Sequence, residues 1–156
     1  MEALDDRRRG VDRRIDRLEQ ARAFWEGLGC RVVERSPEAH DRALAWSSHL
    51  PHVVASALAG SVPIDALELA AGAYRDGSRV ASADPGLWSA ILLDNRARLL
   101  EAIDGFDRRL TELRDAVEAA DADRLSELWE LARDRRLRFA FEPERNAKEN
   151  NPENKS

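Results

Sequence analysis

The sequence is poor in the residues that mark several large classes of protein. Its single cysteine, Cys30, excludes an intrachain disulfide and fits a reducing compartment. Lysine occurs only at positions 148 and 155, so the positive charges are almost all arginine. Aromatic residues make up 6% of the chain, and there are only 8 glycines and 6 prolines, which favours helix over sheet. A chain of 156 residues is long enough for one compact domain with its own core.

Other absences narrow the function. The glycines never form the GxGxxG pattern of a dinucleotide-binding turn. A net charge of −5 disfavours binding to a nucleic-acid backbone. The most apolar window, residues 53–74, contains Pro63, Asp65 and Glu68 and is predicted to be a core segment rather than a membrane span. The first residues lack the apolar stretch of a secretory signal, so we expect a cytoplasmic protein without nucleic-acid or membrane partners.

Both ends of the chain are polar, and the part between them has helical periodicity. Residues 1–13 and 140–156 are predicted to be disordered. Apolar spacing predicts a helix from residue 14 to 28 that ends at Gly29, and the β-branched segment 30–35 predicts one strand. Because a lone strand has no partner for its backbone groups, we interpret this segment as the edge of a sheet whose other strands are not present.

Residues 36–139 are predicted to form an all-α domain. Ser36 with Pro37, and Asp84 with Pro85, have the pattern of a helix cap followed by a first helical residue. A long helix is expected from residue 84 to about residue 119. Its apolar residues alternate spacings of four and three, as in a coiled-coil seam that would pair two copies of the chain: Leu99, Ile103, Phe106, Leu110, Leu113 and Val117.

Two further helices complete the expected domain. A short helix is predicted from about Asp65 to Tyr74. A final helix is predicted after a cap at Asp121 and should run to about Arg138. Its inward side is expected to carry Leu125, Leu128, Trp129 and Ala132.

The segment SSHLPH, residues 47–52, is the first candidate site. Pro51 has no N–H, so it frees a carbonyl one turn earlier and bends the helix. Ser48, His49 and His52 then share a face and could line a polar pocket. Alternatively, the histidines are core residues bonded to the backbone. A metal site would need more ligands, and neither His40 nor Cys30 is identified as a third one, so no metal is expected.

The second candidate is Arg79, in the irregular stretch RDGSRVASADP. A guanidinium group matches the two oxygens of a carboxylate, which makes Arg79 a candidate anion-binding residue. Alternatively, Arg79 is a surface residue that caps a helix or pairs with Asp76 or Asp84.

Taken together, these motifs resemble the C-terminal part of prephenate and arogenate dehydrogenases. The resemblance covers about residues 15–135 and includes ARAFWEGLGCRVVERSPEAHDRALAWSSHLPHVVASALA and GAYRDGSRVASADPGLWSAILLDNRARLLEAID. It matches the family's Ser-His-Leu-Pro-His stretch at residues 48–52. It also matches an arginine-bearing turn before a Ser-x-Asp-Pro and a tryptophan, and an asparagine on the long helix: Arg79, Ser82, Asp84, Pro85, Trp88 and Asn95.

The resemblance implies a role in tyrosine biosynthesis. These enzymes oxidatively decarboxylate prephenate or arogenate with NAD or NADP, and they form dimers through a helical C-terminal domain. It implies that His49 and His52 line the substrate pocket, that Ser48 supports it, and that Arg79 binds a substrate carboxylate. The family's catalytic histidine lies in an N-terminal dinucleotide-binding domain, of which residues 14–35 would be the last helix and strand. We therefore expect a chain that binds no cofactor and has no activity alone, and that a separate dinucleotide-binding domain could complement.

Two other functions are compatible with the sequence. The segment LTELRDAVEAADADRLSELWELARDRR has the rhythm of helical chorismate mutases, but their site needs a lysine and this core has none. A helical dimer that senses a ligand or acts as a scaffold, without catalysis, is also compatible.

Overall fold

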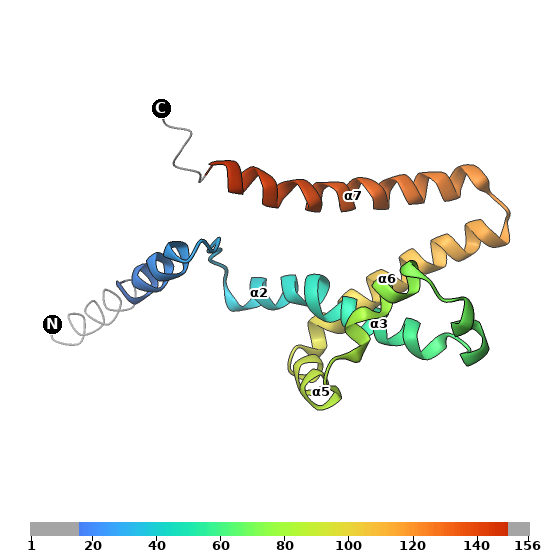
Figure 1. Ribbon diagram of the computed structural model, residues 1–156, viewed down its shortest axis with the longest axis horizontal. Helices are drawn as coiled ribbons and strands as arrows, with labels where there is room; N and C mark the ends of the chain where they lie inside the picture. The colour runs from blue at the N-terminus through green and yellow to red at the C-terminus, as the bar shows by residue number, and fades with distance from the viewer. Residues whose placement is uncertain (1–15, 150–156) are drawn as a thin grey trace. The chain divides into compact units, whose positions relative to one another are not determined.

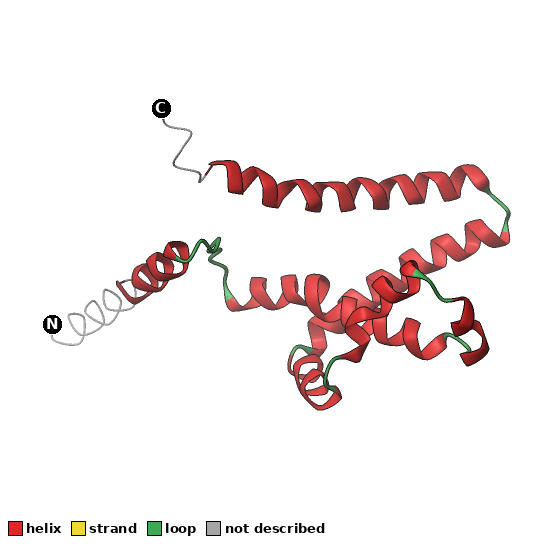
Figure 2. Ribbon diagram, in the orientation of Figure 1, coloured by secondary structure: helices red, strands yellow, loops and turns green. Residues whose placement is uncertain are grey.

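The computed structural model describes the backbone of residues 16–149 and the side chains of residues 16–139. The chain divides into two compact units, Met1–Ala43 and Leu44–Ser156. Figure 2 shows helices and loops, and no strand, over the described residues. The fold is therefore all-α, as predicted. Residues 1–13, which we predicted to be disordered, lie outside the described residues.

The first unit begins with a helix over residues 16–27. Gly29 follows it with a φ of 80°. The N–H of Cys30 donates to the carbonyl of Trp25 at 3.0 Å, and that of Gly29 to Glu26 at 2.9 Å. This is a Schellman motif, which confirms the predicted glycine stop. The exposed side chains of Arg22 and Glu34 form an ion pair, and this hydrogen bond raises the pKa of Arg22 above its ordinary value.

The predicted strand over residues 30–35 is wrong for the structure described. The segment is neither helix nor strand. A strand exists only where a neighbour accepts and donates its ladder bonds, and no described segment pairs with this one. Val33, Leu28 and the helix residues Phe24 and Trp25 are all more than half exposed, so this unit buries little apolar surface by itself.

The helix α2 (Pro37–Leu44) follows and begins as predicted, because Ser36 Oγ accepts the N–H of Ala39 at 3.2 Å. The chain then forms the π-helical turn η1 (Ala45–His49) and the helix α3 (Leu50–Ser61). The N–H of Leu50 bonds to the carbonyl of Ala45, five residues back. Since Pro51 has no N–H to offer, the disturbance expected from it takes the form of a widened turn just before it.

The next segment is less regular than predicted. In place of one helix over residues 65–74, there is a 3-10 helix, η2 (Ile64–Leu69), and then a short helix, α4 (Gly72–Ser78). The extended residues Ala70 and Ala71 divide them. The 3-10 turn η3 (Arg79–Ser82) follows directly and packs against α3.

The predicted long helix is two helices, α5 (Pro85–Asp94) and α6 (Arg96–Glu118). Asp84 caps α5 as expected, because its side chain accepts the N–H of Leu87 at 2.7 Å. The break lies at Asn95, whose φ of −103° and ψ of 30° are not helical. The single long helix predicted from residue 84 to about residue 119 is therefore interrupted at this residue.

The core of the second unit lies where η1 and α3 pack on α6, and Figure 1 shows α3 crossing α6. Its buried centre consists of Ala45, Leu50 and Ala102, and the partly buried side chains around it are Val54, Ile103 and Phe106. The indole of Trp46 lies so close to Gly105 that a Cβ at that position would clash with it. The small residues of α6 thus allow the π-turn to approach closely.

The last helix, α7 (Ala122–Glu149), packs on α6 after a tight turn. Asp121 caps it, because its side chain accepts the N–H of Arg124 at 2.9 Å. Leu128 is buried as predicted, but Trp129 is 71% exposed and not inward. The helix continues to Glu149, so residues 140–149 of the segment predicted to be disordered are helical, whereas residues 150–156 lie outside the description. No helix among the described residues is both long and apolar enough to cross a membrane.

Candidate functional site

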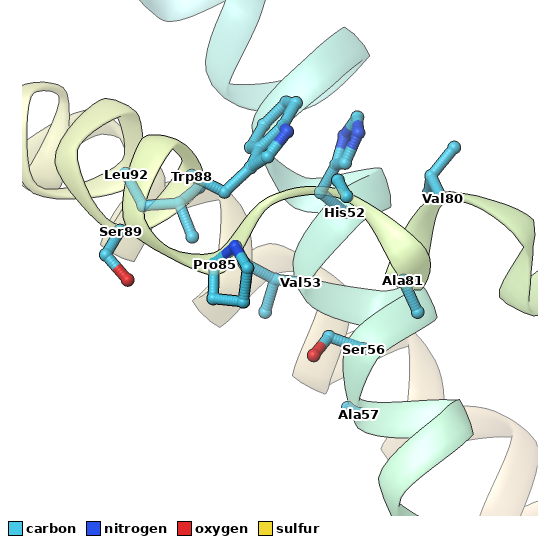
Figure 3. A pocket seen from close by; sticks show the side chains of 11 residues that line it. His52, Val53, Ser56, Ala57, Val80, Ala81, Pro85, Trp88, Ser89 and Leu92 are labelled. Carbon is cyan, nitrogen blue, oxygen red and sulfur yellow. The ribbon is translucent and has the colours of Figure 1, made fainter.

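A cavity of about 400 Å³ opens between α3, η3 and the start of α5 (Figure 3). The packing of η3 on α3 and the cap at Asp84 hold its walls in place. Most of its wall is apolar, and its polar side chains are one imidazole, one indole and two hydroxyls. The lining residues are His52, Val53, Ser56, Ala57, Val80, Ala81, Ala83, Pro85, Trp88, Ser89 and Leu92.

His52 is one of the polar residues that line this cavity. Its ring stacks on the indole of Trp88, with 3.4 Å between the ring centroids and 19° between the planes. The Nδ1 atom lies 2.9 Å from the carbonyl oxygen of Ser48, one helical turn earlier. Because a carbonyl can only accept, Nδ1 carries a proton and donates it. The ring is therefore fixed by a hydrogen bond on one edge and by stacking on one face.

His49 has a different environment from His52. Its side chain is 6% exposed, and its Nδ1 lies 3.3 Å from Nδ2 of Asn95, which donates to it. The ring meets the indole of Trp88 edge to face, at 6.4 Å and 81°. His49 does not line the cavity. His49 is thus a buried core histidine, but it bonds to the side chain of Asn95 and not to the backbone. His52 bonds to the backbone and also lines the cavity.

Ser48 and Arg79 lie beside the cavity rather than in its wall. Ser48 contributes its carbonyl oxygen to His52. Arg79 is exposed and begins η3, immediately before the lining residue Val80. Within the described part of the chain its guanidinium has no ion pair or hydrogen bond. The alternative partners are engaged elsewhere, since Asp76 pairs with Arg75 and Asp84 caps α5.

Sequence reasoning missed two of the polar lining residues, Ser56 and Ser89. Figure 3 shows both on the cavity wall, one from α3 and one from α5. Spacing could have indicated them, because Ser56 is one helical turn after His52 and Ser89 follows Trp88. Among the described residues, no three His, Cys, Asp or Glu side chains are grouped closely enough to hold a metal ion.

Residues 36–131 match the family described as prephenate dehydrogenase, dimerization domain. This span contains the whole cavity. The chain belongs to the prephenate dehydrogenase family. Among its relatives, the cyclohexadienyl dehydrogenase of Zymomonas mobilis is 40% identical over 123 residues, and the prephenate dehydrogenase of Bacillus subtilis is 35% identical over 126.

Solved structures of the family have the same fold. The prephenate dehydrogenase of A. aeolicus, in complex with hydroxyphenyl propionate and NAD+, superposes with a TM-score of 0.72 at 32% identity over 80% of this chain. The arogenate dehydrogenase of Synechocystis gives 0.70 at 29% identity, also over 80% of this chain.

The match covers only part of each relative. The alignments cover 73% and 76% of this chain, but 41% of the Zymomonas mobilis enzyme and 34% of the Bacillus subtilis enzyme. The two solved structures are covered to 46% and 48%. The chain therefore spans less than half the length of the family members that it matches.

Proposed function

We propose that this chain is the substrate-binding and dimerisation portion of a prephenate dehydrogenase. The observation that carries the proposal is the cavity walled by the stacked pair His52 and Trp88. Arg79, which has no ion pair within the described part of the chain, immediately precedes the lining residue Val80. A small ring with carboxylate substituents fits these features. The ring can lie against apolar and aromatic walls, and a carboxylate can form two parallel hydrogen bonds with Arg79.

In the proposed reaction, a hydride leaves the ring carbinol of prephenate or arogenate for NAD or NADP. The bond from the ring to its carboxylate breaks, carbon dioxide departs, and the ring becomes aromatic. This chain's part is to bind and orient the substrate. The sequence contains no glycine-rich dinucleotide turn, so its residues do not fit the cofactor, and we assign NAD or NADP to a dinucleotide-binding domain outside residues 1–156.

The same proposal includes a homodimer. The first half of the predicted seam faces the core, with Leu99 buried, but Leu110 and Val117 are 53% and 64% exposed. Large apolar residues of α7, including Trp129, are exposed as well. A large exposed apolar surface is uncommon on a small monomeric protein and often marks an interaction site. The family's description as a dimerization domain supports a second copy of the chain as the partner that buries it.

A calorimetric titration of the purified chain with prephenate tests the binding role. We expect saturable binding that weakens at least tenfold in Arg79→Ala, since one charged bidentate contact contributes about 1.5 to 3 kcal/mol. The matched control is Arg75→Ala, because Arg75 is also exposed but is paired with Asp76. Equal loss in both variants would contradict a specific role for Arg79, and no binding by the wild-type chain would contradict substrate binding by this portion.

A second measurement tests whether this chain binds the substrate while a separate domain binds the cofactor. The chain alone, mixed with prephenate and NAD or NADP, should give no reduced cofactor. Turnover by the pure chain would show that a dinucleotide site lies within residues 1–156.

A further inference from the structure

His52 lines the cavity, and its second ring nitrogen, Nε2, has no hydrogen-bond partner among the described residues. We infer that a ligand carboxylate binds at this nitrogen, and that binding takes up one proton from water to make the ring an imidazolium. The inference rests on the proposed function, because it assigns the second carboxylate of the same ligand.

The proton follows from the hydrogen bonds of the imidazole. A neutral imidazole has one N–H, and in His52 that proton lies on Nδ1, which donates to the carbonyl of Ser48 at 2.9 Å. Nε2 is then a lone pair and would repel a carboxylate oxygen. A carboxylate can bind there only when Nε2 carries a proton too, so that both ring nitrogens donate.

His49 shows that this arrangement is particular to His52. Nδ1 of His49 accepts from Asn95, so its neutral form already carries the proton on Nε2. An anion next to His49 would not require an added proton. The two neighbouring histidines of SSHLPH are thus set in opposite tautomers by a carbonyl acceptor and an amide donor.

In the free protein no charged side chain of the cavity wall favours protonation of His52, and the ligand would supply the favourable charge. No Asp, Glu, Lys or Arg lines the cavity, and none of the described charged side chains is paired with His52. Arg75 pairs with Asp76, and Arg98 with Glu101. Other ionisable groups lie on the described elements that pack around the site. Before and within η3 they are His49 on η1, Tyr74, Arg75 and Asp76 on α4, and Arg79 on η3. After it they are Asp84 before α5, Asp94 at the end of α5, and Arg96, Arg98 and Glu101 on the first turns of α6.

Stacking supports the charged form of the ring. An imidazolium lying flat on an indole is attracted to the ring's electron-rich face, and the parallel geometry of His52 and Trp88 permits this. A ligand carboxylate would supply the opposite charge that the free cavity lacks.

Calorimetry in two buffers measures the proton directly. Prephenate is titrated into the full chain at about pH 8 in Pipes and in Tris, whose ionisation enthalpies differ widely. Because the hydrogen bond to Ser48 places the single proton of the neutral ring on Nδ1, a carboxylate at Nε2 needs an added proton, and we expect proton uptake on binding. The affinity should also fall as the pH rises, because binding that takes up a proton weakens when protons are scarcer.

Two histidine variants complete the test. His52→Gln keeps an N–H donor that needs no proton, so the uptake should vanish and the pH dependence should flatten. His40→Gln, a change at an exposed histidine outside the cavity, should leave both as in the wild type. The wild-type measurement decides the question even if His52→Gln does not fold.

Each outcome separates the two proposals. Binding with equal heats in both buffers, or proton uptake that persists in a folded His52→Gln variant, overturns the inference and leaves the proposed function intact. Absence of binding by the wild-type chain at every pH contradicts the proposed function and the inference with it.

Discussion

Nδ2 of Asn95 lies 3.3 Å from Nδ1 of His49 and joins the break between α5 and α6 to the π-turn η1, 46 residues earlier in the chain. His49 in turn meets Trp88 edge to face, and Trp88 stacks on His52. The side chain that interrupts the long helix thus holds the ring that supports the cavity wall.

Asn95→Ala should therefore destabilise the protein. It leaves the buried acceptor of His49 without its donor, which costs about 1 to 3 kcal/mol of unfolding free energy. Urea unfolding followed by circular dichroism measures the change. Asp94→Ala, at the preceding exposed position, is the control and should stay within about 0.5 kcal/mol of the wild type. If the two variants were equally stable, the contact between Asn95 and His49 would contribute nothing measurable to the unfolding free energy.

Gly105→Ala tests the close approach of α6 to Trp46. The new Cβ would lie 3.0 Å from Cζ2 of Trp46 and closer still to Cη2, so the indole must move. We expect a loss of about 1 to 2 kcal/mol from overpacking, although alanine is the better helix former. In a Trp46→Ala background the same change should become stabilising by up to about 1 kcal/mol.

Gly60→Ala provides the matched control for that experiment. A Cβ at Gly60 meets nothing within 4 Å, so no loss is expected there. A stability for Gly105→Ala that does not depend on residue 46 would contradict the packing described.

Ala120→Gly should stabilise the chain. Ala120 has a φ of 51°, and its N–H bonds to Val117 while that of Asp121 bonds to Ala116. This is the Schellman ending that usually carries glycine, and a left-handed alanine costs about 1 kcal/mol. We expect a gain of that order in thermal or urea unfolding. Ala119→Gly, at a φ of −77°, should instead lose up to about 1 kcal/mol.

The exposed end of the seam can be tested through the oligomeric state. Val117→Glu, alone or with Leu110→Glu, should shift the chain from dimer to monomer in multi-angle light scattering, because a carboxylate cannot be buried there without a partner. Arg108→Glu lies on the other side of α6, since two residues advance a helix by about 200°, and should remain dimeric. A wild-type monomer at micromolar concentration would contradict the dimer.

The parts of the fold that were predictable depend on local chemistry. Ser36, Asp84 and Asp121 cap the helices that follow them, and Gly29 ends its helix, because each acts on backbone groups within a few residues. The break at Asn95 was not predictable from apolar spacing. It accompanies a contact with His49 that is distant in sequence.

The sequence motifs pointed to the region of the cavity but not to most of its lining residues. The motif indicated Ser48, His49, His52 and Arg79 together, and the structure gives each a different position. Only His52 lines the cavity, because hydrogen bonds to Ser48 and Asn95 turn the two histidines to different surroundings. Trp129 shows the same limit, since its helical periodicity predicted an inward position but the side chain is 71% exposed.

The most direct test of substrate binding by this cavity is a crystal structure of the chain soaked with hydroxyphenyl propionate, the ligand in the A. aeolicus complex. We expect density for the ring against Trp88, with its carboxylate within hydrogen-bond distance of Arg79 or of Nε2 of His52. Density for the ligand only at another place on the chain, with the cavity holding water alone, would contradict the assignment of this cavity as the substrate site.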